Sequence, residues 1–508
     1  MEGIIKDMNK KHNPYKDRAN RMVERWAGQR TGAERRNPSR EIDHQRNAPY
    51  PFIDQDTKQI VEPQRHIPVL DTCDVLVIGG GPAGLSAALS ARRAGADTIL
   101  LERFGCFGGV ITTVGMETIA WYRYEGTVDS EGIGVEMEKL AAKMGGTIKW
   151  PYNDSECLDA DFFKIVADHL ITEAGVRPYL HSFATEVIME GNVIKGIIAE
   201  SKSGRNAILA KRVVDCTGDA DIAHLAGAPY RKTAREEMMG VTTVFSCAGI
   251  DKEKFLEYTR EHTATFADWG RTWKKVTTGK EDQLPSPYLG KEFAKAKELG
   301  IMPKRLDTIG GSWSALSDAG EATNLNLVHM KGYDCTDVRD LTQAEMQGRR
   351  DTLYALEALR AVVPGFENAK LRNFGMTLGC RDSRKILGRY SLSENDVKSQ
   401  ARFEDSIGIF PEFLDGYNVL ILPTTGRYFQ VPYGCLVPQA VDNLLVAGRC
   451  VAGDKISHSA MRNMMACTVT GQGAGAAAAV SVQEGTSTGT VDIGKVQNEL
   501  ERQKVRIR

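Results

Sequence analysis

Three glycines at the end of a short apolar run could bind phosphate through the main chain alone. Gly79, Gly81 and Gly84 have G-x-G-x-x-G spacing, and the run 75–78 before them has strand character. In this arrangement the first glycine permits a tight turn, the second lets the backbone approach a diphosphate and the third lets the next helix pack closely. The free N–H groups and positive end of that helix, with Pro82 in its first turn, would face the phosphates without a lysine.

A carboxylate follows the glycines at the distance expected for ribose recognition. The run 83–94 predicts an Ala/Leu-rich helix that Gly95 ends, and 98–101 predicts a second strand that closes on Glu102. A carboxylate at this point can accept hydrogen bonds from both ribose hydroxyls of an adenosine, and it repels a 2′-phosphate. Because strand, turn, helix and strand coincide, the stretch predicts a dinucleotide site more strongly than the glycine spacing does alone.

The residues after this carboxylate resemble those of one class of enzymes. Glu102 and Arg103, followed by Gly108 and Gly109, stand in the E-R-x-x-x-x-G-G pattern of FAD-dependent oxidoreductases of the glutathione-reductase structural class. The resemblance implies FAD as the cofactor. It also implies that Arg103, Gly109 and Val110 line the diphosphate and ribityl chain.

Three later stretches extend this resemblance. Alternating runs over 178–214 predict three antiparallel strands, an insertion that the class carries with its adenine contact at the position of Ala184. The end of that run, 213–220, resembles the A-T-G-D strand end of the class, and 443–449 resembles its L-L-V-A-G-R-C strand. The helix that follows would direct its positive end at the N1 and O2 edge of the flavin. The residues predicted to bind FAD are Gly79, Gly81, Pro82, Ala83, Gly84, Glu102, Arg103, Gly108, Gly109, Val110, Ala184, Thr217, Gly218, Asp219, Gly448, Arg449, Asn463 and Met464.

Four polar side chains are candidates for the chemistry beside the flavin. His458 is the first candidate for general acid or base, because histidine changes charge near neutral pH; a structural role is the alternative. Arg381 could anchor a carboxylate through two hydrogen bonds, or donate a proton as an arginine does in fumarate-reductase flavoproteins, which the chain resembles more loosely. Arg462, just before the flavin-facing helix, and Tyr433, near the last strand, complete the set. His329 is a further polar group in the same region as Arg381.

The route of the electrons separates the hypotheses about function. No second G-x-G-x-x-G follows a strand within 236–430, so electrons are expected to enter without a nicotinamide domain of the chain's own. The first hypothesis is hydride transfer between flavin and a small organic substrate, as C=C reduction or C–C desaturation, or as oxidation of C–OH or C–N. The second is a flavoprotein monooxygenase, although Gly448-Arg449 stands where its Gly-Asp pair should be. The third is an electron-transfer subunit of a larger complex, against which the lack of clustered cysteines counts.

The elements that must position these residues indicate an α/β fold. We expect a Rossmann-type FAD-binding domain with an inserted antiparallel β-meander, and a mixed α+β substrate or cap domain over the flavin. In the second domain 241–250, 310–316 and 324–330 predict strands and 341–363 predicts a long helix; an Ala/Gly-rich helix is expected over about 460–480. The expected domains are an N-terminal extension or arm (1–70), the first part of the FAD-binding domain (71–235), the substrate or cap domain (236–430), the second part of the FAD-binding domain (431–485) and a C-terminal tail (486–508).

The composition argues against several classes of binding partner and metal site. The chain has 508 residues, a formal net charge of −1 and 26% charged residues, a balance that points neither to nucleic acid nor to an anionic membrane. Its ten cysteines are single, without a C-x-x-C pair, which argues against a zinc or iron–sulfur site; Cys106 in the flavin loop is the one of interest. No apolar stretch approaches about eighteen residues and the N-terminus is polar, so we expect a cytoplasmic protein without a membrane span.

Two segments keep several interpretations open. Residues 1–70 are rich in Arg, Lys, Asn, Pro and Gln and lack periodic apolar positions. They could form an ordered arm that packs on the main body or on a second subunit of a homo-oligomer, a disordered tail, or a tail for polyanions. The aromatic residues Trp121, Tyr122 and Tyr124 around Arg123 could lie near the flavin or pack between domains.

Overall fold

The structure is a computed structural model with two units, Met1–His66 and Ile67–Arg508. In the first unit, β1 (Phe52–Asp54) and β2 (Gln59–Val61) form an antiparallel hairpin. Most of the expected arm, together with Trp121 and Tyr122, lies outside the described residues. The structure describes residues 50–119, 123–268, 273–304, 306 and 309–508.

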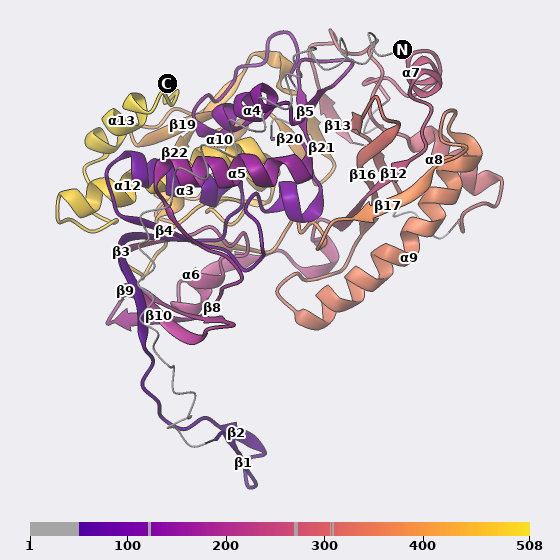
Figure 1. Ribbon diagram of the computed structural model, residues 1–508. Coiled ribbons are helices and arrows are strands. Elements are labelled where there is room, and N and C mark those ends of the chain that lie inside the picture. The colour runs from indigo at the N-terminus through magenta and orange to yellow at the C-terminus, as the bar shows by residue number, and fades with distance from the viewer. Residues whose placement is uncertain (1–49, 120–122, 269–272, 305, 307–308) are drawn as a thin grey trace, which may run out of the picture. The chain divides into compact units, whose positions relative to one another are not determined.

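A parallel sheet forms one part of the second unit (Figure 1). Its residues 75–78, 98–101, 213–215 and 444–446 are buried, as expected for parallel strands that lie between covering elements. All carboxyl ends therefore meet at one edge, where the turns after the strands come together. The strand order is β7 (Arg177–Tyr179), β4 (Thr98–Leu101), β3 (Val69–Ile78), β10 (Gly204–Asp215) and β23 (Leu444–Val446).

The long strand β10 belongs to two sets of strands. Its first half pairs with β9 (Val193–Ser201), which pairs in turn with β8 (Phe183–Glu190), and both pairings are antiparallel. Its last residues, 213–215, pair in parallel with β23. The three strands expected over 178–214 are thus present, and the third of them continues into the parallel sheet.

Small residues bring two helices onto each other beside this sheet. Helices α3 (Pro82–Arg93) and α12 (Met464–Gln483) are in contact along their lengths, and α5 (Ala160–Ala174) lies beside α3 (Figure 1). A Cβ on Gly471 would lie 2.1 Å from the carbonyl oxygen of Ala83. Only glycine permits so close a packing of the two backbones.

Two helices cover this region: the Ala/Gly-rich helix expected over about 460–480 is α12, and a separate short helix precedes it. The first, α11 (Lys455–Met461), ends before Asn463, whose extended backbone at φ −65° and ψ 145° breaks the helical path, and α12 begins at the next residue. The amide of Asn463 donates hydrogen bonds to the carbonyls of Ser459 and Ala460, at 3.0 and 2.9 Å. Because the last carbonyls of a helix lack partners within it, this side chain stabilises the end of α11.

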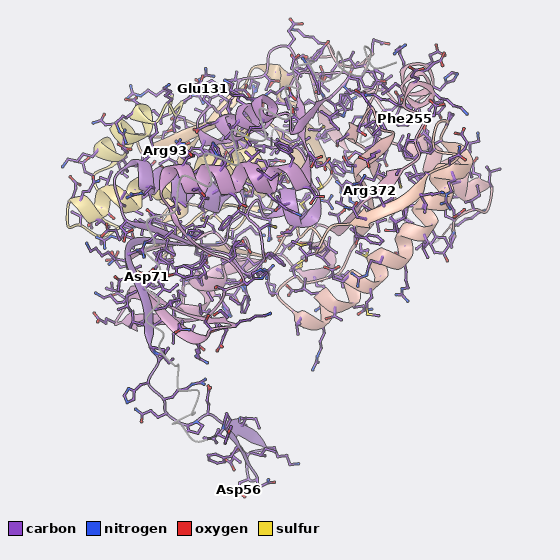
Figure 2. All side chains as sticks on the ribbon, in the orientation of Figure 1. Asp56, Asp71, Arg93, Glu131, Phe255 and Arg372 are labelled. Carbon is purple, nitrogen blue, oxygen red and sulfur yellow. The ribbon has the colours of Figure 1, made fainter. Side chains whose placement is uncertain are left out.

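An antiparallel sheet and a long helix build a second core. Helix α9 (Val338–Val362) lies along the sheet (Figure 1). The strand expected over 310–316 is interrupted at Trp313, whose ring is buried against Trp150 and Phe255, the latter labelled in Figure 2. The sheet contains β14 (Ile309–Ser312), β16 (Glu321–Met330), β12 (Val241–Ala248) and β17 (Lys370–Phe374) in that order, with β15 (Ala315–Leu316) also paired to β16.

The remaining elements include a helix in the expected C-terminal tail. This helix, α13, buries Val496 and Leu500. No helix in the described part of the chain is long and apolar enough to cross a membrane. The remaining elements are α4 (Ile133–Met144), α6 (Asp221–Leu225), α7 (Lys252–Glu261), α8 (Gly290–Glu298), α10 (Glu394–Lys398), α13 (Ile493–Arg502), β5 (Thr147–Lys149), β6 (Glu156–Leu158), β11 (Tyr230–Lys232), β13 (Lys274–Val276), β18 (Arg384–Ile386), β19 (Ser406–Pro411), β20 (Leu414–Gly416), β21 (Val419–Ile421) and β22 (Tyr428–Pro432).

A buried carboxyl links the two cores. Glu117 accepts hydrogen bonds from the Thr323 hydroxyl on β16 and from the N–H of Ala160 at the start of α5. Burial raises the pKa of Glu117 from 4.5 to about 8, and these hydrogen bonds offset only part of the effect. The folded protein therefore holds this carboxyl in its protonated form at neutral pH.

Replacing this carboxyl by an amide should remove a pH dependence of stability. Between pH 4.5 and pH 8 the folded protein keeps a proton on Glu117 that the unfolded chain has released, so wild-type stability falls as pH rises through this window. From pH 5 to pH 8 we expect Glu117→Gln to gain on the order of 2–4 kcal/mol over wild type in urea unfolding. The exposed Glu253→Gln is the control, and parallel pH profiles for Glu117→Gln and wild type would contradict the prediction.

Candidate active site

The turn after β3 is closed by two of the three predicted glycines. Gly79 has φ +98°, and a Cβ on it would lie 2.4 Å from the carbonyl oxygen of Cys216. A Cβ on Gly84 would lie 1.7 Å from the carbonyl oxygen of Gly79, so α3 packs directly on the turn. Gly81 differs, because its φ is −74° and the nearest atom to a Cβ would be the Cα of Gly109 at 3.7 Å. The chain itself requires glycine at 79 and 84, whereas at 81 it leaves space for a group from outside.

The second glycine pair lies against this turn. Gly108 and Gly109 have φ values of +113° and +52°, and the N–H of Gly108 donates to the carbonyl of Gly80 at 2.8 Å. A Cβ on Gly109 would lie 2.5 Å from the Cα of Gly81, so the two turns meet main chain to main chain. No side chain caps the N-terminus of α3 among the described residues, which leaves its first N–H groups available to an anion. We call these two turns and the start of α3 the cradle.

One side of the cradle is closed by Glu102. Its carboxylate is buried and accepts hydrogen bonds from the N–H groups of Gly80, at 2.6 Å, and Phe104, at 2.9 Å. Each carboxylate oxygen has a further lone pair, so the same group can also accept from ribose hydroxyls. Arg103 beside it is exposed, with its guanidinium 4.8 Å from the centroid of the Phe104 ring.

The ends of β10 and β23 close the opposite side. Asp219 and Arg449 form an ion pair at 2.7 Å in which each side chain is 15% exposed. Burial raises the pKa of Asp219, but the charge of Arg449 and the hydrogen bonds from Ser383 and Arg449 together outweigh it, and the pKa lies below its ordinary value. Gly218 has φ +85° and a Cβ on it would lie 3.0 Å from Nη2 of Arg449, so glycine permits this contact. Thr217 and Gly448 flank the pair in sequence.

The other predicted cofactor residues are distributed around these elements. Pro82 and Ala83 form the first turn of α3. Val110 begins the π-helical turn η1 (Val110–Val114), directly after the second glycine pair. Ala184 is half-buried on β8. Asn463 and Met464 stand at the start of α12, as expected.

A segment of the second core, 375–384, is held next to the cradle at both of its ends. Near its start, the N–H of Thr377 donates to a carbonyl of η1 at 3.1 Å. Near its end, the hydroxyl of Ser383 accepts from Nη1 of Arg449 at 2.9 Å. The residues between these two contacts therefore lie beside the predicted cofactor site.

Arg381, within this segment, carries a partly buried charge whose hydrogen bonds go only to neutral groups. Nη1 donates to the carbonyl of Gly240 at 2.9 Å and to Nδ1 of His329 at 3.1 Å, and Nη2 donates to Oδ1 of Asn326 at 3.2 Å. No carboxylate pairs with it among the described residues. Burial, with the charge of Arg462 as the second cause, lowers the pKa of Arg381 from 12.5 to about 10.

The histidine in this cluster is neutral and held in one tautomer. Nε2 of His329 lies 2.9 Å from the carbonyl oxygen of Asn326, and a carbonyl only accepts. Nε2 therefore carries the proton, and Nδ1 accepts from Arg381. Burial, followed by the Arg381 charge, lowers the pKa of His329 to about 3. A Cβ on Gly311 would lie 2.9 Å from Nε2, so the glycine makes room for the ring.

Three of the four predicted catalytic residues lie together here. Nε2 of His458 is 2.9 Å from the carbonyl oxygen of Arg381, and Arg462 pairs with Asp415 at 3.2 Å. Burial, and next the charge of Lys385, lowers the pKa of His458 to about 3. The expectation that His458 changes charge near neutral pH is therefore wrong, because protonation would bury a second positive charge beside Lys385.

One further expectation, that of Tyr433 as a catalytic residue, needs correction. The hydroxyl of Tyr433 donates to the carbonyl of Thr488 at 2.7 Å, and the side chain is buried in the core of the parallel sheet. Its hydroxyl is therefore directed at the C-terminal part of the chain and not at Arg381 or His458. Arg384, three residues after Arg381, forms an ion pair with Asp221 on α6 at 2.9 Å.

The sequence did not identify the partners that hold these groups. Asn326 orients Arg381, while Asp382 and Tyr417 hydrogen bond to each other beside His458. The only available signal was that Asp382 directly follows Arg381. Asn326 and Tyr417 come from separate strands and loops, which fold next to the cluster only in three dimensions.

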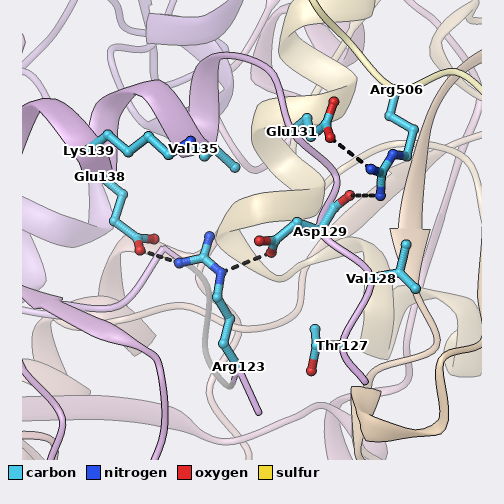
Figure 3. Close-up of a pocket in the computed structure, with 9 residues that line it drawn as sticks. All are labelled: Arg123, Thr127, Val128, Asp129, Glu131, Val135, Glu138, Lys139 and Arg506. Atoms are coloured by element: carbon cyan, nitrogen blue, oxygen red, sulfur yellow. Dashed lines mark hydrogen bonds and ion pairs between the residues drawn. The ribbon is translucent and has the colours of Figure 1, made fainter. Parts of the chain in front are cut away.

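A separate pocket of about 500 Å³ lies between α4 and the C-terminal residues (Figure 3). There Arg123 bridges Asp129, at 2.9 Å, and Glu138, and Arg506 pairs with Glu131 at 2.8 Å. These charges are matched within the pocket, as Figure 3 shows.

Tyr124, expected near the flavin or between domains, packs against a small cluster of Phe266, Leu420 and Leu422.

Comparison with known proteins identifies the family. A family model described as FAD dependent oxidoreductase matches residues 74–500. Urocanate reductase of Eggerthella lenta is 31% identical over 197 residues, which are 35% of this chain and 30% of that protein. Thiamine thiazole synthase of Methanococcus vannielii is 28% identical over 162 residues, 29% of this chain and 58% of that protein. The matches thus span less than two thirds of these curated relatives.

Solved structures that match most of the chain include that of a reductase-like protein. A geranylgeranyl bacteriochlorophyll reductase-like protein from Thermoplasma acidophilum covers 85% of this chain, and 82% of that protein is covered, with 14% identity and a TM-score of 0.41. The glycine turns fit the cofactor of the matched family, since position 81 leaves open space where a diphosphate would lie against free N–H groups. The chain is therefore an enzyme that belongs to the family of FAD-dependent oxidoreductases, with FAD as its cofactor.

Proposed function

We propose that this enzyme transfers a hydride between FAD and a carbon atom of a small organic substrate, and that its reaction is the reduction of a C=C bond or the reverse desaturation. Bound FAD supplies or accepts the hydride. The single observation that carries the proposal is the partly buried guanidinium of Arg381, held by neutral acceptors in a segment that contacts η1, directly after the second glycine turn, and Arg449.

Arg381 is suited to stabilise the negative charge and to donate the proton in such a reduction. A reduced C=C bond gains a hydride on one carbon and a proton on the other, and negative charge develops on the group conjugated to it. A buried guanidinium stabilises that charge more strongly than it would in water. Its pKa, lowered to about 10, also makes it a better proton donor than an ordinary arginine. A carboxylate on the substrate would supply the anion that Arg381 lacks.

We further propose the arrangement of FAD that the glutathione-reductase class has, within a Rossmann-type domain. Glu102 would accept from the adenosine ribose, and Arg103, Gly109 and Val110 would line the diphosphate and ribityl chain. The start of α12 would face the N1 and O2 edge of the flavin. The strand order and the meeting of the two glycine turns support this proposal.

Oxidation of an alcohol or amine is the second candidate. It requires a base to take a proton from the substrate, and a histidine would be the usual one. His329 and His458 are both poor bases, because burial lowers each pKa to about 3. This observation favours reduction of C=C over the second candidate.

The test is anaerobic reoxidation of the photoreduced enzyme. Unsaturated carboxylates should restore the visible absorption of oxidised flavin, and their saturated analogues should not. Matched alcohols and amines, added to the oxidised enzyme, should leave its colour unchanged. Bleaching by an alcohol or amine, together with no reoxidation by any enone or enoate, would replace the first candidate with the second.

A further inference from the structure

His458 makes its hydrogen bond to a main-chain atom and not to a reacting group. Nε2 lies 2.9 Å from the carbonyl oxygen of Arg381, and the side chain is 2% exposed. Since a carbonyl can only accept, Nε2 must carry the proton and donate it to this bond. The ring of His458 therefore hydrogen bonds to the backbone of Arg381, whose guanidinium has a role in the proposed function.

We propose that His458 is a positioning residue: by holding the carbonyl of Arg381 it fixes the peptide from which the guanidinium extends, and so sets the distance of that guanidinium from the substrate. This inference rests on the proposed function of Arg381. It assigns to His458 neither proton transfer nor contact with the substrate.

A set of buried groups fixes the same peptide from the other side. Asp382 accepts hydrogen bonds from the ammonium of Lys385 and from the hydroxyl of Tyr417. Lys385 also donates to the carbonyl of Ser383 at 3.1 Å. Three consecutive residues are thus each held at one group: Arg381 at its carbonyl by His458, Asp382 at its carboxylate by Lys385 and Tyr417, and Ser383 at its carbonyl by Lys385.

The charges around the ring explain why a neutral histidine suits this position. Lys385, Asp382 and Arg462 face it, and Nε2 is 3.9 Å from Oδ1 of Asp382. Lys385 already balances the carboxylate of Asp382. A protonated His458 would therefore add an unbalanced charge to a cluster that already holds Arg381 without a carboxylate partner. The neutral ring donates one hydrogen bond without that cost.

A double-mutant cycle between the two residues tests the inference. We expect His458→Ala to lower kcat/KM for C=C reduction about 10- to 100-fold, as expected for a misplaced catalytic group. His458→Gln, whose amide N–H can reach the same carbonyl, should keep most of the activity. In the Arg381→Gln background the same His458→Ala change should have no further effect, because there is no guanidinium left to position.

Each other outcome of this cycle has a definite meaning. If His458→Ala lowers kcat/KM by the same factor in both backgrounds, His458 does not act through Arg381 and the inference fails. If Arg381→Gln alone leaves kcat/KM unchanged, the proposed function of Arg381 fails, and an effect of His458→Ala would then also overturn positioning.

Should His458→Ala not fold, Tyr417→Phe, which loosens Asp382, replaces it in the cycle. Tyr433→Phe is the matched control, since it removes another buried hydrogen bond, to Thr488, outside the cluster.

Discussion

Arg381→Gln is expected to lower kcat for reduction of an unsaturated substrate by about 10²- to 10³-fold, the usual cost of losing one charge-stabilising donor in an active site. The guanidinium is the positive group that the segment 375–384 holds beside the cradle without a carboxylate partner. Glutamine keeps a similar length and one amide donor but has no charge to offer. The measurement is the rate of flavin reoxidation after rapid mixing with the substrate, and FAD content should remain that of wild type.

Two comparisons make this result specific. Arg381→Lys keeps the charge but not the planar fork that reaches Gly240, His329 and Asn326 together, so we expect an intermediate rate. Arg350→Gln, on the exposed face of α9, is the control and should react as wild type does. Loss of FAD from Arg381→Gln would mean that the residue supports the cradle instead, and an unchanged rate would remove it from the reaction.

The pH dependence offers an independent check on the same group. Because the pKa of Arg381 is lowered to about 10, the wild-type rate should fall as pH rises toward that value, where an ordinary arginine would still be fully charged. His329 and His458 have pKa values near 3, so neither should cause a change of rate between pH 6 and pH 8.

The cradle could be predicted from the sequence because its constraints are local. Gly79 needs its positive φ and Gly84 needs the close approach of α3, and both requirements arise within a few residues of each other. Glu102 reaches the turn before α3 from 22 residues further along the chain, at the end of the next strand, a separation typical of this strand–helix–strand pattern. Spacing along the chain therefore carries most of this geometry.

The polar cluster could not be predicted in the same way, since its contacts join distant parts of the chain. Arg381 meets His329 and Asn326 across a strand whose pairing with β12 is broken by irregular register, so counting residues does not give the neighbours. The sequence singled out Arg381 and His329 separately, and the fold brings them together. It also chose His458 for its ordinary pKa, which the burial of the ring and the charge of Lys385 change.

The glycines of the cradle allow a prediction that separates folding from cofactor binding. Gly81→Ala should leave the apoprotein as stable as wild type, because φ is −74° and the nearest atom to the new methyl group is 3.7 Å away. The same methyl group would occupy the space of the diphosphate, so FAD should bind about 10- to 100-fold more weakly, the effect of about 1–3 kcal/mol of crowding. The measurements are thermal unfolding of the apoprotein and titration with FAD by the quenching of flavin fluorescence.

Gly84→Ala is the comparison variant, and its apoprotein should be less stable than that of Gly81→Ala. Its Cβ would lie 1.7 Å from the carbonyl oxygen of Gly79, a contact that exists with or without FAD, so the apoprotein itself should lose stability. The exposed Gly494→Ala on α13 is the control for both measurements. A methyl group at position 81 would clash with a diphosphate that lies against this turn. If Gly81→Ala binds FAD as tightly as wild type, the diphosphate therefore lies elsewhere. Equal loss of apoprotein stability in Gly81→Ala and Gly84→Ala would instead show that the first turn tolerates no side chain at either position, whatever it binds.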